Sequence, residues 1–180
     1  MNLRFSLFTA SLFAVIYLTG CADSGSNDGL TFNNDMETTF AFNEHPASNI
    51  VYFKNAHSGR YVSIIDTSNI WCGGFNMKVK DIDPAPLSKV TIGAWMYAQQ
   101  PNADAQLAID IRDKDGNTLD WLGQPAHDFL TTTVNWTWVQ MEVDLSVKNR
   151  NNIDNTYRIY VVNNTGSAVL VDDLKIRFEK

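Results

Sequence analysis

The sequence predicts an all-β fold, a two-sheet antiparallel β-sandwich, and three observations lead to this prediction. Apolar and polar residues alternate through most of the chain, which is the period of a half-buried strand. Clusters of Gly, Pro, Asn and Asp interrupt these segments roughly every 8–12 residues. No convincing helical pattern and no internal repeat is visible. Antiparallel strands with one solvated face, arranged as a sandwich or jelly roll, fit this pattern best.

The expected strands follow from that alternation. In the first half they are Leu30–Phe42, Ile50–Phe53, Arg60–Ile65 and Phe75–Lys80, the last ended by Pro84 and Pro86. In the second half they are Lys89–Ala98, Ala105–Arg112, Thr118–Leu122, Thr131–Leu145, Thr156–Val162 and Ala168–Phe178. Residues 113–117, Asp-Lys-Asp-Gly-Asn, predict a hairpin turn between two of these strands.

The residues before the domain have the parts of an export signal. Arg4 gives a short positive start, and the run from Leu7 to Leu18 is mostly apolar. That run is too short for a comfortable membrane span, which takes about 20 residues. The segment Leu18-Thr19-Gly20-Cys21 resembles the lipobox of bacterial lipoproteins, Leu-x-Gly-Cys, in which the Cys is acylated and becomes the mature N-terminus.

We therefore expect three parts: residues 1–20 as a lipoprotein signal peptide, 21–30 as the lipidated Cys21 with a flexible tether, and 31–180 as one β-sandwich domain. The alternative for the first part is an uncleaved apolar helix ending at a free Cys. Acylation, with palmitate among the chains, implies a cell-envelope protein held at the outer membrane, on its periplasmic or its surface face. Ala22 rather than Asp follows Cys21, so the simplest inner-membrane retention signal is absent, although Asp23 leaves the choice of membrane open.

The charge balance excludes some partners. The chain has a formal net charge of −6, and removal of the leader with Arg4 leaves 13 basic against 20 acidic residues, or −7. No basic stripe is visible and the pI is about 4.9, so we expect no nucleic-acid binding. The acidic excess also argues against anionic polymers as ligands, although local basic groups, namely Lys54, Arg60 and Arg112, could override it.

The two cysteines have different expected fates. Cys21 is consumed by the anchor, so Cys72 cannot form an internal disulfide. It is a partly buried residue beside the Gly73-Gly74 turn, a partner for another chain, or a reactive thiol. A domain without a disulfide must rely on its core.

Five short motifs, in matching order from Thr31 to Lys180, resemble those of the galactose-binding-like jelly roll of carbohydrate-binding modules. They are Asn34-Asp35-Met36-Glu37, His57-Ser58-Gly59-Arg60-Tyr61, the strand from Leu87 to Trp95, Asn135-Trp136 with its following strand, and Val171-Asp172-Asp173-Leu174. Two positions depart from the family pattern: Met36 stands where Phe is usual, and Ser63 comes one position later than the family's Ser.

The resemblance implies a structural calcium ion. In the family this ion joins an acid of the first strand to an acid of the last, with carbonyls from the Ser-Gly turn. Here these ligands would be Glu37 and Asp172, with carbonyls near Gly59 and Arg60. Alternation also places Asp172 on the core face of its strand, where a carboxylate needs a cation or several donors. The alternatives are a salt bridge to Arg60 or solvation at a strand end.

An aromatic platform is the second candidate site. If Lys89–Ala98 and Ala105–Arg112 pair as a hairpin with Ala98 opposite Ala105, Trp95 stands beside small neighbours with its ring face clear. Tyr97, Gln106, Asp110 and Arg112 would line the same face, and Trp121 could extend it. Rings stack on sugar C–H patches while amide, carboxylate and guanidinium groups bond hydroxyls. The alternative is that loops cover this face and make Trp95 a second-layer core residue.

We expect no catalytic residues. The three His residues lack metal-ligand spacing, and neither a nucleophile motif nor a phosphate-binding loop is present. Jelly-roll polysaccharide lyases are the main enzyme competitor, and Tyr52-Phe53-Lys54 resembles one of their strands, but their Arg-rich strand and Gln-x-His element are absent. A glycosidase pair could be drawn from Asp110, Asp120 or Asp128, as on any acidic surface.

Two functional hypotheses from different classes remain. The first is a membrane-anchored, non-catalytic carbohydrate-binding lipoprotein whose partner is a polysaccharide or oligosaccharide. The second is a structural or adhesive lipoprotein that binds a protein partner through the same sandwich face or through a sheet edge.

Overall fold

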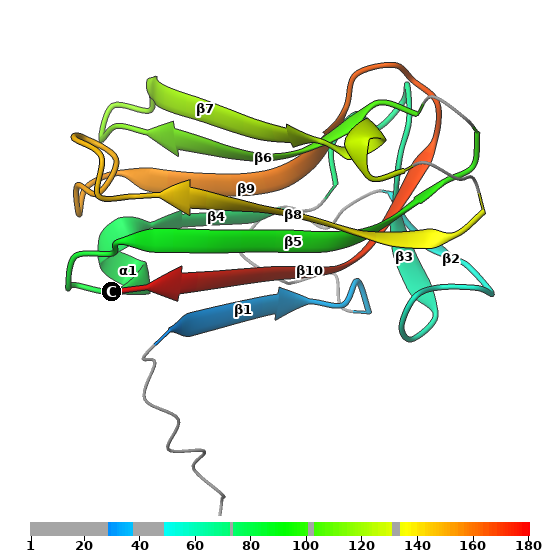
Figure 1. Cartoon of the computed structure of the whole chain (residues 1–180), viewed down its shortest axis with the longest axis horizontal. Coiled ribbons are helices and arrows are strands. Elements are labelled where there is room, and N and C mark those ends of the chain that lie inside the picture. Colours follow the sequence, from blue (N-terminus) through cyan, green and yellow to red (C-terminus); the bar gives the residue numbers. More distant parts are fainter. Residues whose placement is uncertain (1–28, 38–48, 73, 101–102, 131–133) are drawn as a thin grey trace, which may run out of the picture.

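The chain folds as a two-layer antiparallel β-sandwich, as predicted (Figure 1). The structure is a computed structural model that describes residues 29–37, 49–72, 74–100, 103–130 and 134–180. Sheet A has six strands in the order β2-β3-β10-β5-β8, and β1 pairs with β10 as well. Sheet B has four strands in the order β4-β9-β6-β7.

The strands of sheet A are β1 (Leu30–Asn34), β2 (Ile50–Tyr52), β3 (Tyr61–Ile65), β5 (Lys89–Ala98), β8 (Trp136–Asp144) and β10 (Val169–Glu179). Those of sheet B are β4 (Phe75–Lys78), β6 (Ala105–Arg112), β7 (Thr118–Pro125) and β9 (Thr156–Asn163). Two short helical turns, α1 (Val79–Ile82) and η2 (Ala126–Asp128), follow β4 and β7.

The core lies between the two sheets, and β5 and β6 contribute to it by alternation. In β5, Val90, Ile92 and Met96 are fully buried, and in β6 Leu107 and Ile109 are their counterparts from the other layer. The residues between them along each strand turn to the outer face of their sheet, away from this core. The sequence pattern therefore correctly predicts which side chains of β5 and β6 point inward.

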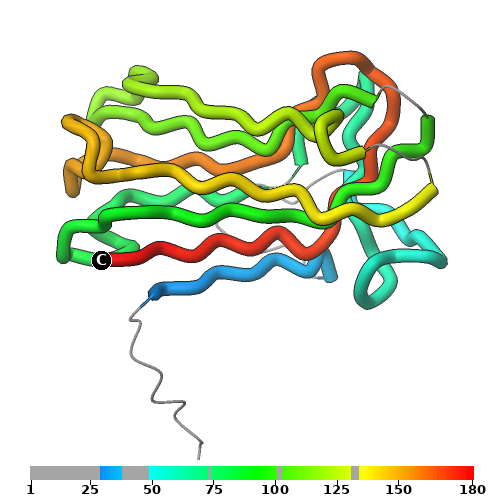
Figure 2. The backbone as a smooth tube through the Cα atoms, viewed as in Figure 1, coloured from blue at the N-terminus to red at the C-terminus, as the bar shows by residue number. Residues whose placement is uncertain are grey.

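Strand β10 is the axis of sheet A and runs between β1 and β5 (Figure 2). Its register with β5 shifts between Asp172 and Lys175, which marks a β-bulge. Before the bulge, Asp172 lies opposite the outward-facing Trp95, and after it Ile176 lies opposite the inward-facing Ile92. The prediction that Asp172 lies on the core face is therefore wrong, because the bulge reverses the alternation within the strand.

Four predicted strand ends also need correction. Strand β7 continues to Pro125 where the prediction ended at Leu122, and β8 begins at Trp136, after a bend at Val134 and Asn135, where the prediction began at Thr131. The other two lie in the first half of the chain. The strand expected over Leu30–Phe42 ends at Asn34, whose side-chain oxygen accepts the Met36 N–H (3.0 Å), and Met36 has a φ of 59°. The rest of that predicted strand after Glu37 lies outside the described residues. After β4 the chain forms α1 instead of continuing as a strand, because one helical turn buries both Val79 and Ile82.

The predicted hairpin between β5 and β6 is wrong. Strand β5 pairs with β10 and β8 in sheet A, whereas β6 pairs with β9 and β7 in sheet B. Alternation identifies the buried face of a strand but not its neighbour, and the link between β5 and β6 crosses from one layer to the other. The hairpin predicted at residues 113–117 is confirmed: it joins β6 to β7, with the Asp113 N–H donating to the Asn117 carbonyl (2.9 Å).

Candidate functional site

The outer face of sheet A carries Trp95 and Tyr97, and other rings cover both. The imidazole of His57 stacks on Trp95 with ring centroids 4.0 Å apart and an interplanar angle of 16°. Trp138, on the neighbouring β8, packs against Trp95 at 5.6 Å, and Trp136 packs against Tyr97 at 5.4 Å. The expectation that the face of Trp95 is clear is therefore wrong.

The loop of residues 53–60 holds this aromatic cluster in place. The Trp136 Nε1–H donates to the Asn55 carbonyl (2.7 Å), and His57 Nδ1 lies 2.6 Å from the Asp173 carboxylate. On β8, the Trp138 ring fills the space directly over Gly93 and would collide with any Cβ there. These contacts make Trp95 and Tyr97 a second packing layer on the outside of sheet A.

The outer face of sheet B brings together the other predicted residues. Gln106, Asp110 and Arg112 turn outward from β6, and the strand register places Asp110 directly opposite Trp121 of β7. On the other side of β6, Arg158 of β9 lies opposite Asp110. The six predicted ligand-binding residues are thus divided, with Trp95 and Tyr97 on sheet A and the remaining four on sheet B.

Exposed aromatic side chains mark the face of sheet B. Trp121 is 44% exposed and Trp71 is 54% exposed. Between them lies Tyr160 of β9, whose hydroxyl accepts the Trp121 Nε1–H (3.0 Å) and whose ring meets Trp71 edge-on with centroids 5.6 Å apart. Trp71 itself forms an isolated bridge with Val162 at the end of β9. The arrangement is two indoles connected by a buried tyrosine.

Small residues form the floor beneath Trp121. Gly123 lies two positions along β7, and a Cβ placed there would come within 2.7 Å of the indole ring and 2.9 Å of Gln106 Oε1. Ala108 is the residue opposite Gly123 in β6 and is fully buried. The indole therefore lies over Gly123 while part of its surface remains open to solvent.

Asp110 organises the polar part of this face. The residue is only 3% exposed, and its two carboxylate oxygens accept from Arg112 Nε (2.7 Å) and from the Thr118 hydroxyl (3.0 Å). A buried carboxylate requires such partners. Asp110 consequently fixes the guanidinium of Arg112 beside the aromatic surface.

Sequence reasoning missed Trp71, Tyr160 and Arg158 as members of this face. The alternation of β9 contains the signal for two of them, since Tyr157, Ile159 and Val161 point inward and Arg158 and Tyr160 must then point outward. Trp71 lies in a segment outside any regular strand, so no periodicity could place it.

The predicted calcium site, Glu37 with Asp172, converges on the turn of residues 57–61. One oxygen of Glu37 accepts the N–H groups of Arg60 (2.6 Å) and Tyr61 (2.8 Å). Asp172 accepts the Ser58 N–H (3.0 Å) and lies fully buried. The structure thus brings both predicted ligands to the same turn, although their sequence positions are far apart.

Burial raises the pKa of Asp172 to about 6, and the neighbouring charge of Asp173 adds to the rise. Glu37, Asp172 and Asp173 all hold this turn, and such hard oxygen donors suit Ca²⁺. Among the described residues, however, no group of three or more His, Cys, Asp or Glu side chains has the arrangement of a metal site. The residues fit a calcium ion only if carbonyl oxygens complete the ligand set, as the resemblance implies.

Cys21 and the whole leader lie outside the described residues. Neither short helix in the described part of the chain has the length or apolarity to cross a bilayer. Cys72 is buried, and its sulfur accepts the Val161 N–H at 3.0 Å. It behaves as a packed residue at the end of sheet B.

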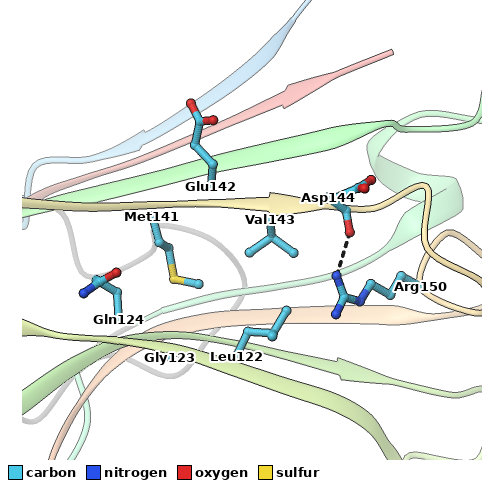
Figure 3. Close-up of a pocket in the computed structure, with 8 residues that line it drawn as sticks. All are labelled: Leu122, Gly123, Gln124, Met141, Glu142, Val143, Asp144 and Arg150. Atoms are coloured by element: carbon cyan, nitrogen blue, oxygen red, sulfur yellow. Dashed lines mark hydrogen bonds between the residues drawn. The ribbon is translucent and has the colours of Figure 1, made fainter.

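A separate cavity of about 250 Å³ opens along one side of the sandwich, between edge strands β7 and β8 (Figure 3). Core-directed side chains Leu122, Met141 and Val143 form its floor. Arg150 closes one end, since its guanidinium bonds the Asp120 carboxylate of β7 (2.7 and 2.8 Å) and the Asp144 carbonyl of β8 (2.8 Å). The cavity shares no residue with the aromatic face of sheet B apart from Gly123.

No protein family matches the sequence, and no curated protein matches it. Solved structures do match the fold. The chain is similar to the CBM22-1 xylan-binding domain of Paenibacillus barcinonensis Xyn10C, with a TM-score of 0.55 and 17% identity over 86% of this chain and 96% of that one. It is similar to the CBM22-2 xylan-binding domain of the same protein, with a TM-score of 0.51 and 12% identity over 81% and 97%.

The tandem of those two domains matches with a TM-score of 0.56 and 17% identity, over 88% of this chain and 48% of the tandem. At these identities the likeness establishes the fold: a β-sandwich of the kind found in carbohydrate-binding modules. The predicted fold class is confirmed.

Proposed function

We propose that this protein is a non-catalytic carbohydrate-binding lipoprotein, and that it binds a polysaccharide or oligosaccharide on the outer face of sheet B. The observation that carries the proposal is the pair of exposed indoles, Trp121 and Trp71, joined through Tyr160. Indole faces stack on the C–H surfaces of sugar rings. The outward Gln106 and Arg112 supply the fixed polar groups that sugar hydroxyls require, and the buried Asp110 holds Arg112 in place.

The structural neighbours support the ligand class. Two single domains that are similar to this chain, over 86% and 81% of its length, are xylan-binding domains. A fold hosts many functions, so the proposal depends on the site and uses the neighbours only as support.

A non-catalytic role agrees with how the candidate carboxylates are placed. Asp110 turns to the outer face of sheet B, whereas Asp120 is held at the open edge by Arg150. Asp128 lies beyond them in η2, near Gln124 and His127. A glycosidase pair must flank one bond from a shared cleft, and these groups face different directions.

We also propose that Cys21 is acylated and holds the domain at the outer membrane through the tether that follows it. Several acyl chains give stable anchoring where a single chain is marginal. Metabolic labelling with a radioactive fatty acid tests this: the wild-type chain should be labelled, and Cys21→Ser should not. Label on both forms would contradict the proposal.

We also propose a structural calcium ion, on the basis of the resemblance to carbohydrate-binding modules. Glu37 and Asp172 would hold it together with turn carbonyls, and the ion would neutralise carboxylates that now converge on one turn. Thermal unfolding with calcium and with a chelator is the test. A melting temperature that responds to neither would end this idea.

A glycan array probed with the full chain in mild detergent tests the binding function. We expect bound polysaccharides, and we expect Trp121→Ala to weaken binding by roughly tenfold or more, as for other aromatic hot spots. Tyr52→Ala is the matched control, because Tyr52 is 65% exposed on sheet A, away from the proposed site. Equal losses in both variants, or no bound glycan, would contradict the proposal.

The cavity between β7 and β8 favours one alternative, a protein partner. Within the described residues no strand pairs with the outer edge of either strand, and free edges can accept a strand from another chain. Copurification of a partner that depends on this edge, with an empty glycan array, would favour it.

A further inference from the structure

We propose that the outer face of sheet B recognises a carboxylate-bearing glycan, that is, a polysaccharide containing uronic acids. This inference rests on the proposed carbohydrate-binding function and names its ligand class. Its basis is an uneven distribution of charge over the molecule. The chain as a whole is acidic, with a net charge of −6, whereas basic side chains outnumber acidic ones in two cross-strand rows of this face.

The register of the four strands defines which side chains belong to the face. The outward positions form cross-strand rows, one of which is Trp121, Asp110, Arg158 and Asn76. The next row is Thr118, Arg112, Thr156 and Lys78. Across these two rows three side chains are basic and one is acidic, so basic groups outnumber acidic ones there although the protein as a whole is negative.

The single acidic side chain, Asp110, is already neutralised. It is buried, and Arg112 and Thr118 occupy its two oxygens. The next acidic residues along the chain, Asp113 and Asp115, lie beyond the strand in the hairpin turn. They bond Asn117 and Lys114 there. Asp110 therefore orients the basic groups of the face more than it repels an anion.

The chemistry of the basic groups favours carboxylate over hydroxyl. A guanidinium has five N–H donors in a planar fork, so a contact with Asp110 still leaves donors for a ligand. Arg pairs with carboxylates in a bidentate manner, which is stronger than a neutral hydrogen bond. Arg112 and Arg158 flank Asp110 within the same face as the exposed Trp121.

The spacing also suits one sugar residue and its acidic substituent. Neighbouring strands lie about 4.8 Å apart, so Trp121 on β7 and Arg158 on β9 are separated by two such spacings, roughly 10 Å. A pyranose stacked on Trp121 would direct a carboxylate, on itself or on a neighbouring unit, toward Arg112 and Arg158. Ring stacking and charge pairing would then act on the same ligand.

The test compares one polymer with and without its charge. Glucuronoxylan and polygalacturonate are each measured as such and after chemical reduction of their carboxyl groups, against the full chain in mild detergent. We expect the native polymers to bind about tenfold more tightly than the reduced ones, and the difference to shrink at high salt. Dextran sulfate serves as a polyanion without uronic acids.

Two variants and one control assign the effect to the face. Arg158→Gln and Arg112→Gln should bring the affinity for the native polymer down to that of the wild type for the reduced polymer. Arg177→Gln, on the outer face of sheet A, removes one positive charge elsewhere and should keep the preference. Thermal melting of each variant checks that it is folded, and the comparison of polymers on the wild type stands even if a variant unfolds.

The outcomes separate this inference from the function beneath it. Equal affinity for native and reduced polymers overturns the uronate inference and leaves carbohydrate binding intact. Binding of dextran sulfate as tight as that of the uronate polymers also overturns it, because the face would then act as a general anion surface. Binding to neither polymer form, with an empty glycan array, overturns both.

Discussion

The outer faces of the two sheets carry the same kinds of side chains and expose them differently. Trp95 and Trp121 both point outward from their strands, but His57 stacks on Trp95 while Trp121 remains 44% exposed over Gly123. The difference lies in the chain that covers them: the loop of residues 53–60 bonds Trp136 and the last strand over sheet A. An outward aromatic is thus a ligand platform or a packing layer according to a loop far away in the sequence.

Charge is distributed in the same contrasting way. On sheet A, Lys89 lies between Glu179 (3.2 Å) and Glu142 (3.8 Å), so its charge is compensated at the surface. On sheet B, the buried Asp110 holds Arg112 (2.7 Å), and Arg158 lies opposite Asp110 in the strand register. On sheet A the ion pairs of Lys89 compensate its positive charge. On sheet B the basic side chains beside Asp110 can attract an anion.

Trp95→Ala should have the largest effect and should act on stability alone. Removing a ring packed between His57 and Trp138 leaves a cavity beneath the loop, at a cost of about 3 kcal/mol in unfolding free energy. Urea denaturation measures this cost, and glycan affinity of the folded fraction should equal that of the wild type. If the unfolding free energy falls by less than about 1 kcal/mol and glycan binding weakens, the ligand site lies on sheet A instead.

The buried Asp172 should make the loop of sheet A sensitive to pH. Its pKa rises from 3.8 to about 6 on folding, so the folded state holds a proton that the unfolded state has lost. Unfolding free energy measured in chelator should therefore fall as the pH rises from about 4 to 7, by at most roughly 3 kcal/mol.

Asp172→Asn should remove this decline, since an amide does not titrate. Asp83, Asp113 and Asp144, whose pKa values hydrogen bonds lower, act in the opposite direction and at lower pH, where their loss of charge destabilises the fold. An identical pH profile for wild type and Asp172→Asn would show that Asp172 is not buried as described.

Two glycines offer a matched pair for the same comparison. Gly93 lies beneath Trp138 on sheet A, and Gly123 lies beneath Trp121 on sheet B. Gly93→Val should cost about 2 kcal/mol, because Trp138 is packed against Trp95 and cannot move freely.

Gly123→Val should change stability by less than about 1 kcal/mol, because the exposed Trp121 can turn away. It should nevertheless reduce glycan affinity roughly tenfold, as the indole leaves its position over the sheet. Thermal unfolding and glycan titration of both variants measure the pair. Reversed results, with binding lost in the first and stability in the second, would exchange the roles of the two faces.

The sequence predicts the fold well because alternation is a local property. The inward residues of β5 and β6 and the hairpin at Asp113–Asn117 all follow from spacings of a few residues. Glu37 and Asp172 are far apart in the sequence but meet at one turn. Only the family resemblance predicts this, because neither segment contains a local signal for contact with the other.

The platform shows where local reasoning ends. The prediction correctly placed Gln106, Asp110 and Arg112 on an outer face. The assumed hairpin put Trp95 and Tyr97 on that same face, although they lie on the other sheet, across the core. Several strands share the same alternating pattern, so this pattern does not specify which of them pair in the sheet. The prediction that Asp172 lies on the core face is wrong for a related reason. A bulge in β10 turns Asp172 to the other face of the sheet, and the pattern of apolar residues does not reveal it.

Arg150→Met should have the smallest effect on binding, and it tests whether the binding face depends on the open edge of the sandwich. Arg150 bonds Asp120 of β7 and the Asp144 carbonyl of β8, and so connects the open edges of both sheets. Met retains much of the side-chain volume, so the loss should be about 1 kcal/mol of unfolding free energy, with faster amide exchange in β7.

Glycan affinity of Arg150→Met should stay within about twofold of the wild type, because Arg150 acts at the open edge and Trp121 acts on the outer face. Amide exchange and glycan titration on the same sample measure both effects. A fall in affinity that accompanies the faster exchange would mean that the edge between β7 and β8 sets the shape of the binding face. The cavity and the indoles would then form one binding site, and the ligand would contact both sheets rather than sheet B alone.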